Sequence, residues 1–158
     1  MLTEFYQNDK VPLTRAFGRE YPRYFVHPLA EYRALVKACG VIDLTHWRIL
    51  RITGSDRARF LNAMLTNDVA SLEPSRGCHA MMTTVKGKIL SELFVFARKE
   101  DHLVLVSQGD FEETTGALQK HIVADDVAIE DVSAAYAVIA VEGPKAKDVT
   151  GRLFRPGP

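Results

Sequence analysis

The sequence predicts an α+β fold in which one small domain is inserted into another. Between residues 48 and 132, strand and helix signals follow one another in the order β-α-β-β-β-α-β, an elaborated split βαβ pattern. The flanking segments, 1–47 and 133–158, each carry only part of a further domain. We therefore expect a discontinuous first domain formed by these two segments and an inserted subdomain over residues 48–132.

One clear helix and two short strands are predicted in the flanking segments. Pro28 suits a first helical turn, and apolar residues recur over 29–39 at the spacing of one helix face. Gly40 is expected to end this helix, because glycine commonly follows a last turn. Apolar runs predict strands over residues 41–44 and 135–141.

The two ends of the chain give weaker signals. Residues 1–27 are rich in aromatic side chains, and prolines and a glycine there break any long element. At the other end, Lys145–Leu153 could begin a helix, for which no later element supplies a partner. We therefore expect the first domain to be incomplete.

The inserted region alternates short apolar runs with turn signals. Strands are predicted over residues 48–52, 78–84, 89–97, 103–107 and 127–132. Asp56 and Asp110 are expected to cap the two intervening helices, because an N-cap aspartate accepts a hydrogen bond from the first turn. Phe111, Thr114 and Leu118 would then form the inner face of the second helix.

The composition is that of an ordinary globular protein. Of the 158 residues 47% are hydrophobic and 25% charged, and 20 basic residues balance 20 acidic ones without a basic patch. We therefore expect neither a nucleic acid nor a membrane surface as a partner. The apolar runs are too short for a bilayer, and no signal peptide is visible. With only Cys39 and Cys78, both expected as free thiols, we expect a cytoplasmic protein.

Several common chemistries have no motif in this chain. The five histidines and two cysteines lack the spacing of metal ligands such as paired CxxC or HExxH. Neither a GxSxG nucleophile elbow nor a phosphate-binding P-loop is present. The sequence therefore predicts no metal site, and it does not favour a serine hydrolase or a nucleotide-binding enzyme.

Four stretches resemble the amino-terminal half of the glycine-cleavage T-protein, an aminomethyltransferase, and its relative YgfZ. They are Gly40–His46, Ile52–Asp56 with Phe60–Leu61 and Leu65–Asp68, Lys86–Leu93 and Ala140–Ala146. They occur in the family's order and spacing. The resemblance implies a three-domain protein in which a ferredoxin-like split βαβ subdomain is inserted in a folate-binding α+β domain. It also implies tetrahydrofolate, or a folate derivative, as the ligand of a central cavity.

Two features favour the YgfZ-type branch of this family. T-proteins carry two acids after the hairpin glycines, the first facing the folate, whereas this chain has Ser91 and Glu92 there. A carboxylate stabilises developing positive charge or positions a proton better than a hydroxyl does. Glu92 should point to the opposite side of the strand, because side chains alternate. The aromatic-Gly-Trp stretch typical of T-proteins is also missing from residues 21–28.

The resemblance implies five folate-binding positions. Trp47 replaces the family's Met and could stack on the flat pterin ring or pack in a core or interface. His79 replaces a cavity-facing Tyr, although a lone strand histidine is often structural. Gln108 replaces an Asn that hydrogen-bonds the pterin, and Val106 would offer its backbone to the same ring. Ser91 stands at the position of the family's acid, so the catalytic residue is unassigned.

Three functions follow from these observations. The favoured hypothesis is a folate-binding YgfZ-type protein that assists the maintenance or assembly of iron–sulfur enzymes. The alternative is a tetrahydrofolate-dependent aminomethyltransferase that takes its aminomethyl group from the lipoyl arm of a carrier protein. The third is an interaction domain without a ligand. The expected partners are a folate together with iron–sulfur proteins or, in the alternative, a lipoyl carrier protein.

Overall fold

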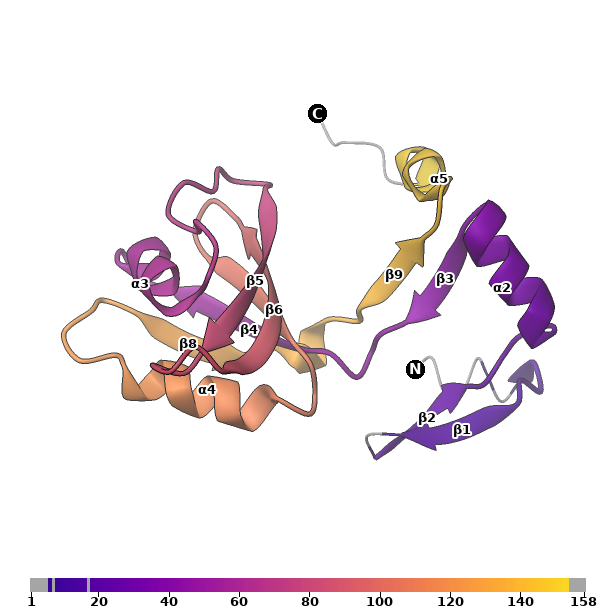
Figure 1. Cartoon of the computed structure of the whole chain (residues 1–158), viewed down its shortest axis with the longest axis horizontal. Coiled ribbons are helices and arrows are strands. Elements are labelled where there is room, and N and C mark those ends of the chain that lie inside the picture. Colours follow the sequence, from indigo (N-terminus) through magenta and orange to yellow (C-terminus); the bar gives the residue numbers. More distant parts are fainter. Residues whose placement is uncertain (1–5, 7, 17, 154–158) are drawn as a thin grey trace. The chain divides into compact units, whose positions relative to one another are not determined.

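The computed structural model describes residues 6, 8–16 and 18–153, which include both helices and strands (Figure 1). The α+β class is therefore confirmed. The chain divides into two compact units: unit 1 combines residues 1–45 and 138–158, and unit 2 is the intervening 46–137. Unit 2 thus starts at residue 46 where the sequence suggested 48, and it ends at 137 where the sequence suggested 132.

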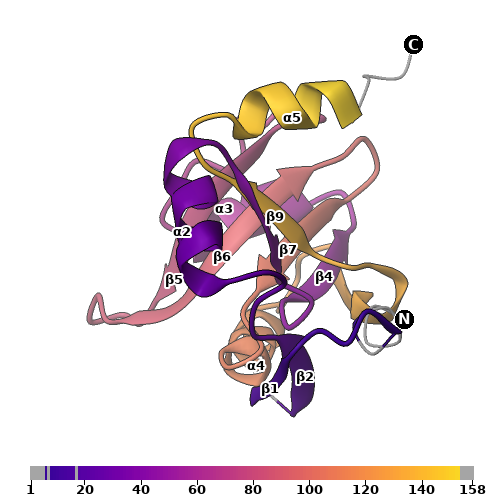
Figure 2. The same ribbon diagram turned by 90° about the vertical axis from the view of Figure 1, so that its right-hand side faces the viewer.

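Unit 1 contains two separate two-stranded sheets and two described helices of at least two turns. Its elements are β1 (Leu13–Ala16), β2 (Arg19–Pro22), α2 (Pro28–Lys37), β3 (Gly40–Asp43), β9 (Ile139–Glu142) and α5 (Ala146–Leu153). β1 and β2 form an antiparallel hairpin (Figure 2), and β3 pairs antiparallel with β9. Segments far apart in the sequence therefore meet in this unit.

Three details of unit 1 differ from expectation. The β1–β2 hairpin was not predicted; Gly18, with φ +73°, supplies its turn. The expected stop at Gly40 was wrong, since α2 is closed by Ala38 and Gly40 already begins β3. The strand expected from residue 135 starts only at Ile139, because residues 133–135 form a 3₁₀ turn. The seryl oxygen of that turn accepts a hydrogen bond from the Ile49 amide at 2.9 Å.

Unit 2 is built on a five-stranded sheet with the order β5-β6-β7-β4-β8, in which every neighbouring pair is antiparallel. Its elements are β4 (Arg48–Thr53), α3 (Arg57–Met64), β5 (Gly77–Thr83), β6 (Ile89–Ala97), β7 (His102–Val106), α4 (Phe111–Lys120) and β8 (Ala128–Asp131). The predicted β-α-β-β-β-α-β order is confirmed. The first strand, β4, lies between β7 and the last strand, β8, as a split βαβ arrangement requires.

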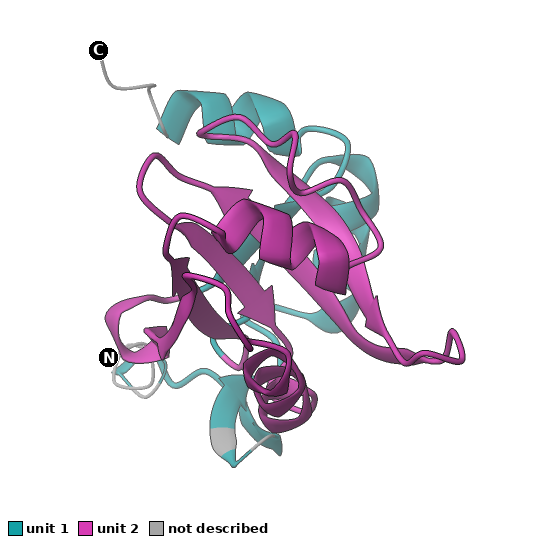
Figure 3. Ribbon diagram, turned by 90° about the vertical axis from the view of Figure 1, so that its left-hand side faces the viewer, with its two compact units in different colours: residues 1–45, 138–158 teal, residues 46–137 magenta. Residues whose placement is uncertain are grey.

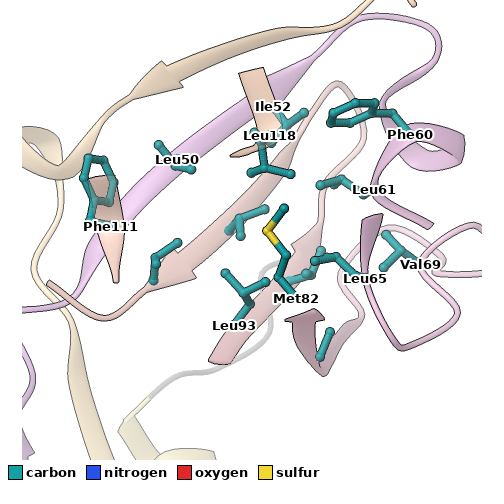
Figure 4. Packing of buried hydrophobic residues seen from close by; sticks show 14 residues of the cluster. Leu50, Ile52, Phe60, Leu61, Leu65, Val69, Met82, Leu93, Phe111 and Leu118 are labelled. Carbon is teal, nitrogen blue, oxygen red and sulfur yellow. The ribbon is translucent and has the colours of Figure 1, made fainter. Parts of the chain in front are cut away.

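The core of unit 2 lies between one face of this sheet and its two helices, which cover the same side (Figure 3). Alternate residues of β6, such as Leu93 and Val95, are fully buried there, beside Leu50 and Ile52 of β4. The helices add the fully or almost fully buried Phe60, Leu61, Phe111 and Leu118 (Figure 4). Burial of each large apolar side chain stabilises the fold by roughly 1.5–3 kcal/mol, so this cluster dominates the stability of unit 2.

The first turns of the two helices in unit 2 are not held by the expected side-chain caps. Neither Asp56 nor Asp110 caps its helix with its side chain. Instead the Asp56 carboxylate accepts a hydrogen bond from the Asp126 amide at 2.9 Å, and the Asp126 carboxylate accepts one from the Ser55 amide at 2.9 Å. Gly54 fits between them with φ +104°, where a Cβ would lie 2.0 Å from the Asp126 carbonyl oxygen. The turn before α3 is therefore locked to the loop before β8.

Candidate functional site

The face of the unit 2 sheet that turns away from the helices carries aromatic and polar side chains. On β6 the partly or largely exposed Glu92, Phe94 and Phe96 alternate with the buried core residues. His79 of β5 stands directly opposite Phe94 in the register. We refer to Trp47, His79, Glu92 and Phe94 as the open-face cluster.

Phe94 is the centre of this cluster. Its ring centroid lies 5.0 Å from that of His79 and 5.5 Å from that of Trp47, with interplanar angles of 35° and 54°. These distances are typical of favourable aromatic contacts. Trp47 directly precedes β4, and the other two residues lie on β6 and β5. The sheet therefore gathers side chains from three separate stretches of sequence.

Glu92 joins the cluster through His79. The His79 Nε2 and Glu92 Oε1 atoms are 2.7 Å apart, and both side chains remain about half exposed, at 45% and 55%. Since a carboxylate at neutral pH only accepts, the ring nitrogen is the donor of this hydrogen bond. An acid–imidazole pair thus lies beside two aromatic rings, on a face that solvent reaches.

The edge strand that carries His79 is fixed by the segment after α3. The Thr66 amide donates to the Met81 carbonyl, and the Met81 amide donates to Thr66 Oγ1, both at 3.0 Å. The Asn67 side-chain amide donates to the His79 carbonyl at 2.8 Å. These bonds occupy the outer edge of β5, and they hold the His79 backbone in place relative to β6.

Ser91 does not belong to the open-face cluster. Its side chain is 2% exposed, pairs across the sheet with Met82 and shares the core face with Leu93. Within the described residues its Oγ has no hydrogen-bond partner. The sheet therefore separates Ser91 from Trp47 and His79, and its contact with a ligand stays a prediction. The expectation that Glu92 points the opposite way is confirmed, and it puts a carboxylate on the open face.

Val106 and Gln108 occupy the end of the sheet near Trp47. Val106 is fully buried on the core face, in register between Arg48 and Leu93, so only its backbone could meet a ligand. Gln108 is partly buried in the turn between β7 and α4. Because Arg48 pairs with Val106, this turn lies at the same end of the sheet as Trp47. The proposed contacts of both residues with a folate stay predictions.

Phe94 was missed by sequence reasoning. The signal was present in the alternation of β6, where Ser91, Leu93 and Val95 share one side and Glu92 and Phe94 the other. A serine followed at every second position by buried aliphatic residues belongs to the core face. Applying this rule would have assigned the open face to Glu92 and Phe94.

A cavity lies inside unit 1. It measures about 310 Å³, and its lining includes Tyr6, Phe25, Glu31, Asp43 and Ile139. The polar groups there already bond to one another: the Tyr6 hydroxyl donates to the Asp43 carboxylate at 2.7 Å, and Glu31 accepts from the Phe25 amide at 2.5 Å. Burial, and then the hydrogen bond to Asp43, raise the pKa of Tyr6 above its usual range. This cavity therefore presents mainly apolar walls.

The described residues show neither a metal-binding group nor a membrane span. Among them, no three or more His, Cys, Asp or Glu side chains are arranged to hold a metal ion. Likewise, no described helix is both long and apolar enough to cross a membrane. Cys39 and Cys78 are free, and burial raises the pKa of the Cys78 thiol, which packs against the core.

Comparison with known proteins decides the family. Residues 2–156 match the family described as the GCVT N-terminal domain. The chain belongs to the aminomethyltransferase family. Within it, the chain is 31% identical over 136 residues to an aminomethyltransferase of Bacillus subtilis (strain 168), a match that covers 86% of this chain and 38% of that relative. An aminomethyltransferase of Anoxybacillus flavithermus is also 31% identical over 137 residues, covering 86% of this chain and 37% of its own.

A solved structure gives the same assignment of the fold. The crystal structure of glycine cleavage system aminomethyltransferase T from Bartonella henselae superimposes with a TM-score of 0.84 at 19% identity, over 99% of this chain and 43% of that one. The chain therefore spans about two fifths of the length of the aminomethyltransferases that it matches. The predicted family is confirmed, and the two relatives bear the name of the aminomethyltransferase branch.

Proposed function

We propose that this chain forms the tetrahydrofolate-facing N-terminal part of a glycine-cleavage-type aminomethyltransferase. The observation that carries this proposal is the Glu92 carboxylate, which lies beside aromatic rings on the face of the sheet away from its helices. The expected loss of transfer chemistry depended on Ser91, whose side chain lies in the core. The names of the relatives support the same branch.

Trp47 and Phe94 would supply the apolar surface for a flat bicyclic ring. Aromatic side chains contact such rings well at offset or tilted angles, and both belong to the open-face cluster. Gln108, at the same end of the sheet as Trp47, has an amide that can donate and accept at once, as the polar edge of a pterin requires. These residues would bind and orient the folate without taking part in bond formation.

Glu92 would act on the charge of the transferred group. A carboxylate fixed near an aminomethyl centre stabilises the positive charge that develops there, and in a site closed to water this effect is larger. The aminomethyl group would arrive on a carrier protein's lipoyl arm. This partner, like tetrahydrofolate itself, is part of the proposal.

Two single substitutions test this function. In the natural polypeptide that carries this sequence, Glu92→Gln should lower the kcat of aminomethyl transfer by about 10²-fold, because the isosteric amide lacks the charge. Tetrahydrofolate affinity, measured by calorimetry, should change by only a few-fold. Ser91→Ala is the matched control, and it should leave both quantities unchanged. Equal losses in the two variants, or no loss in Glu92→Gln, would contradict the proposed role of Glu92.

The YgfZ-type hypothesis is less well supported than before. Its main support was the absence of an acid at Ser91. Its remaining support is the missing aromatic-Gly-Trp stretch in residues 21–28 and the likeness of residues 86–94 to the corresponding YgfZ-type segment. Assistance to iron–sulfur enzymes would be favoured if the natural polypeptide bound tetrahydrofolate tightly and yet gave no aminomethyl transfer. Robust turnover would exclude it as the main activity.

A further inference from the structure

We infer that His79 is a positioning residue, which holds the Glu92 carboxylate over the open face. This inference rests on the proposed function. It goes beyond that function because it names the residue that orients the acid.

The geometry shows how His79 can direct Glu92. The glutamate side chain is half exposed on a strand and would otherwise move among several rotamers. The 2.7 Å hydrogen bond from the His79 Nε2 atom restricts it to one of them. His79 is itself restrained by the Phe94 ring at 5.0 Å and by the backbone bond from Asn67. The carboxylate is therefore held by a ring that packs against Phe94, on a residue whose backbone is fixed by Asn67.

Few other charged groups face this pair. Asp68, next to the segment that borders β5, turns its carboxylate to the Ser71 amide at 3.1 Å. On the same face of the sheet Arg51 of β4, two strands from β6, is paired with Glu130 of β8. The His46 ring lies beside Trp47, at 6.5 Å. Each of these groups contacts another partner, whereas His79 is hydrogen-bonded directly to the Glu92 carboxylate.

The test compares two substitutions at His79 in the natural polypeptide. His79→Gln keeps an N–H donor for Glu92, so kcat should stay within a few-fold of that of the unmodified protein. His79→Phe keeps a ring against Phe94 but has no donor, so kcat should fall by about tenfold or more. Equal kcat values for the two variants would overturn the inference.

A second measurement does not depend on turnover. In ¹⁵N NMR spectra of the imidazole, the unmodified protein should hold the neutral-ring proton on Nε2, and Glu92→Gln should weaken this tautomer preference. The same preference in both proteins would contradict the pairing. If tetrahydrofolate neither binds nor accepts the aminomethyl group, the proposed function fails; if transfer proceeds but the His79 variants behave like the parent, only the inference fails.

Discussion

Unit 2 buries a continuous apolar cluster, whereas the described part of unit 1 buries few of its large apolar side chains and leaves many exposed. Among the described residues, every buried hydrophobic side chain except Tyr6 and Tyr21 belongs to unit 2. In α2, by contrast, Leu29, Tyr32 and Val36 share one helical stripe and are 50%, 63% and 52% exposed. Periodicity alone suggested a buried face for both units. Only unit 2 supplies the surface that covers it.

The difference follows from the sheets. A two-stranded sheet is marginally stable by itself, and unit 1 has two of them. In unit 2, by contrast, two helices cover one side of a five-stranded sheet, so that a helix layer and a sheet layer enclose a core. We conclude that the contacts inside unit 2 specify its fold and support the open-face cluster, while unit 1 gains little stability from its own described contacts.

The sharpest test of this comparison uses two leucines on helices. Leu61 of α3 is fully buried, and Leu29 of α2 is half exposed. Leu61→Ala should lower the free energy of unfolding by about 2–5 kcal/mol, because it removes core contacts and leaves a cavity. Leu29→Ala should cost about 0.5 kcal/mol or less, as is usual for exposed positions. Urea denaturation followed by circular dichroism measures both, and equal costs would refute the contrast between the units.

A smaller but more specific effect is expected at Ser91. Ser91→Asp would restore the acid that T-proteins carry at this position, but here it would bury a carboxylate among aliphatic side chains. We expect a loss of roughly 2–4 kcal/mol in the free energy of unfolding and no gain in transfer activity. The fluorescence of Trp47, the single tryptophan, reports the unfolding of unit 2.

Ser91→Ala is the control for that variant. The Oγ atom has no hydrogen-bond partner among the described residues, so its removal should change stability by only about 0.5 kcal/mol. A stable Ser91→Asp protein with higher turnover would show that position 91 reaches the ligand, and it would restore the original assignment of the acid.

Sequence patterns were most informative about the order of helices and strands in unit 2. The short apolar runs over residues 48–132 and the turn signals between them were sufficient to predict the element order of unit 2. The β1–β2 hairpin was missed because its four-residue strands are too short to show a period, and a proline lies in β2. The two side-chain caps at Asp56 and Asp110 were wrong because tertiary partners and backbone geometry replaced the local bond.

The candidate site was predicted in part for a related reason. Trp47 and His79 were found by their positions in the resemblance, and the structure brings both against Phe94. The structure puts Ser91 on the opposite face from Trp47 and His79, since a shift by one residue in a strand moves a side chain to the other face. The pairing of β6 with β5 in fact slips close to this point, between Met82 and Thr83. Matching residues to a family motif does not reveal such a change of register, whereas the burial of alternate residues along the strand does.

The smallest expected effect concerns pH, and it is confined to unit 2. His102 is 4% exposed at the start of β7, and both of its ring nitrogens lack a partner among the described residues. Burial, and then the nearby Arg57, lower the pKa of His102 from its ordinary value of 6.5, while Asp101 opposes this shift. Below pH 6.5 the unfolded chain therefore binds a proton that the folded chain resists.

Stability should consequently be constant above this pH and should decrease as the pH falls from 6.5 towards the lowered pKa of His102. The carboxyl groups contribute at lower pH, since hydrogen bonds from Arg98 lower the pKa of Asp101 from 3.8. His102→Phe should remove the first decrease and leave the second, whereas the exposed His121→Phe should leave both. Urea midpoints from Trp47 fluorescence between pH 4 and 8 measure this, and an unaltered slope in His102→Phe would show that another group in unit 2 controls its response to acid.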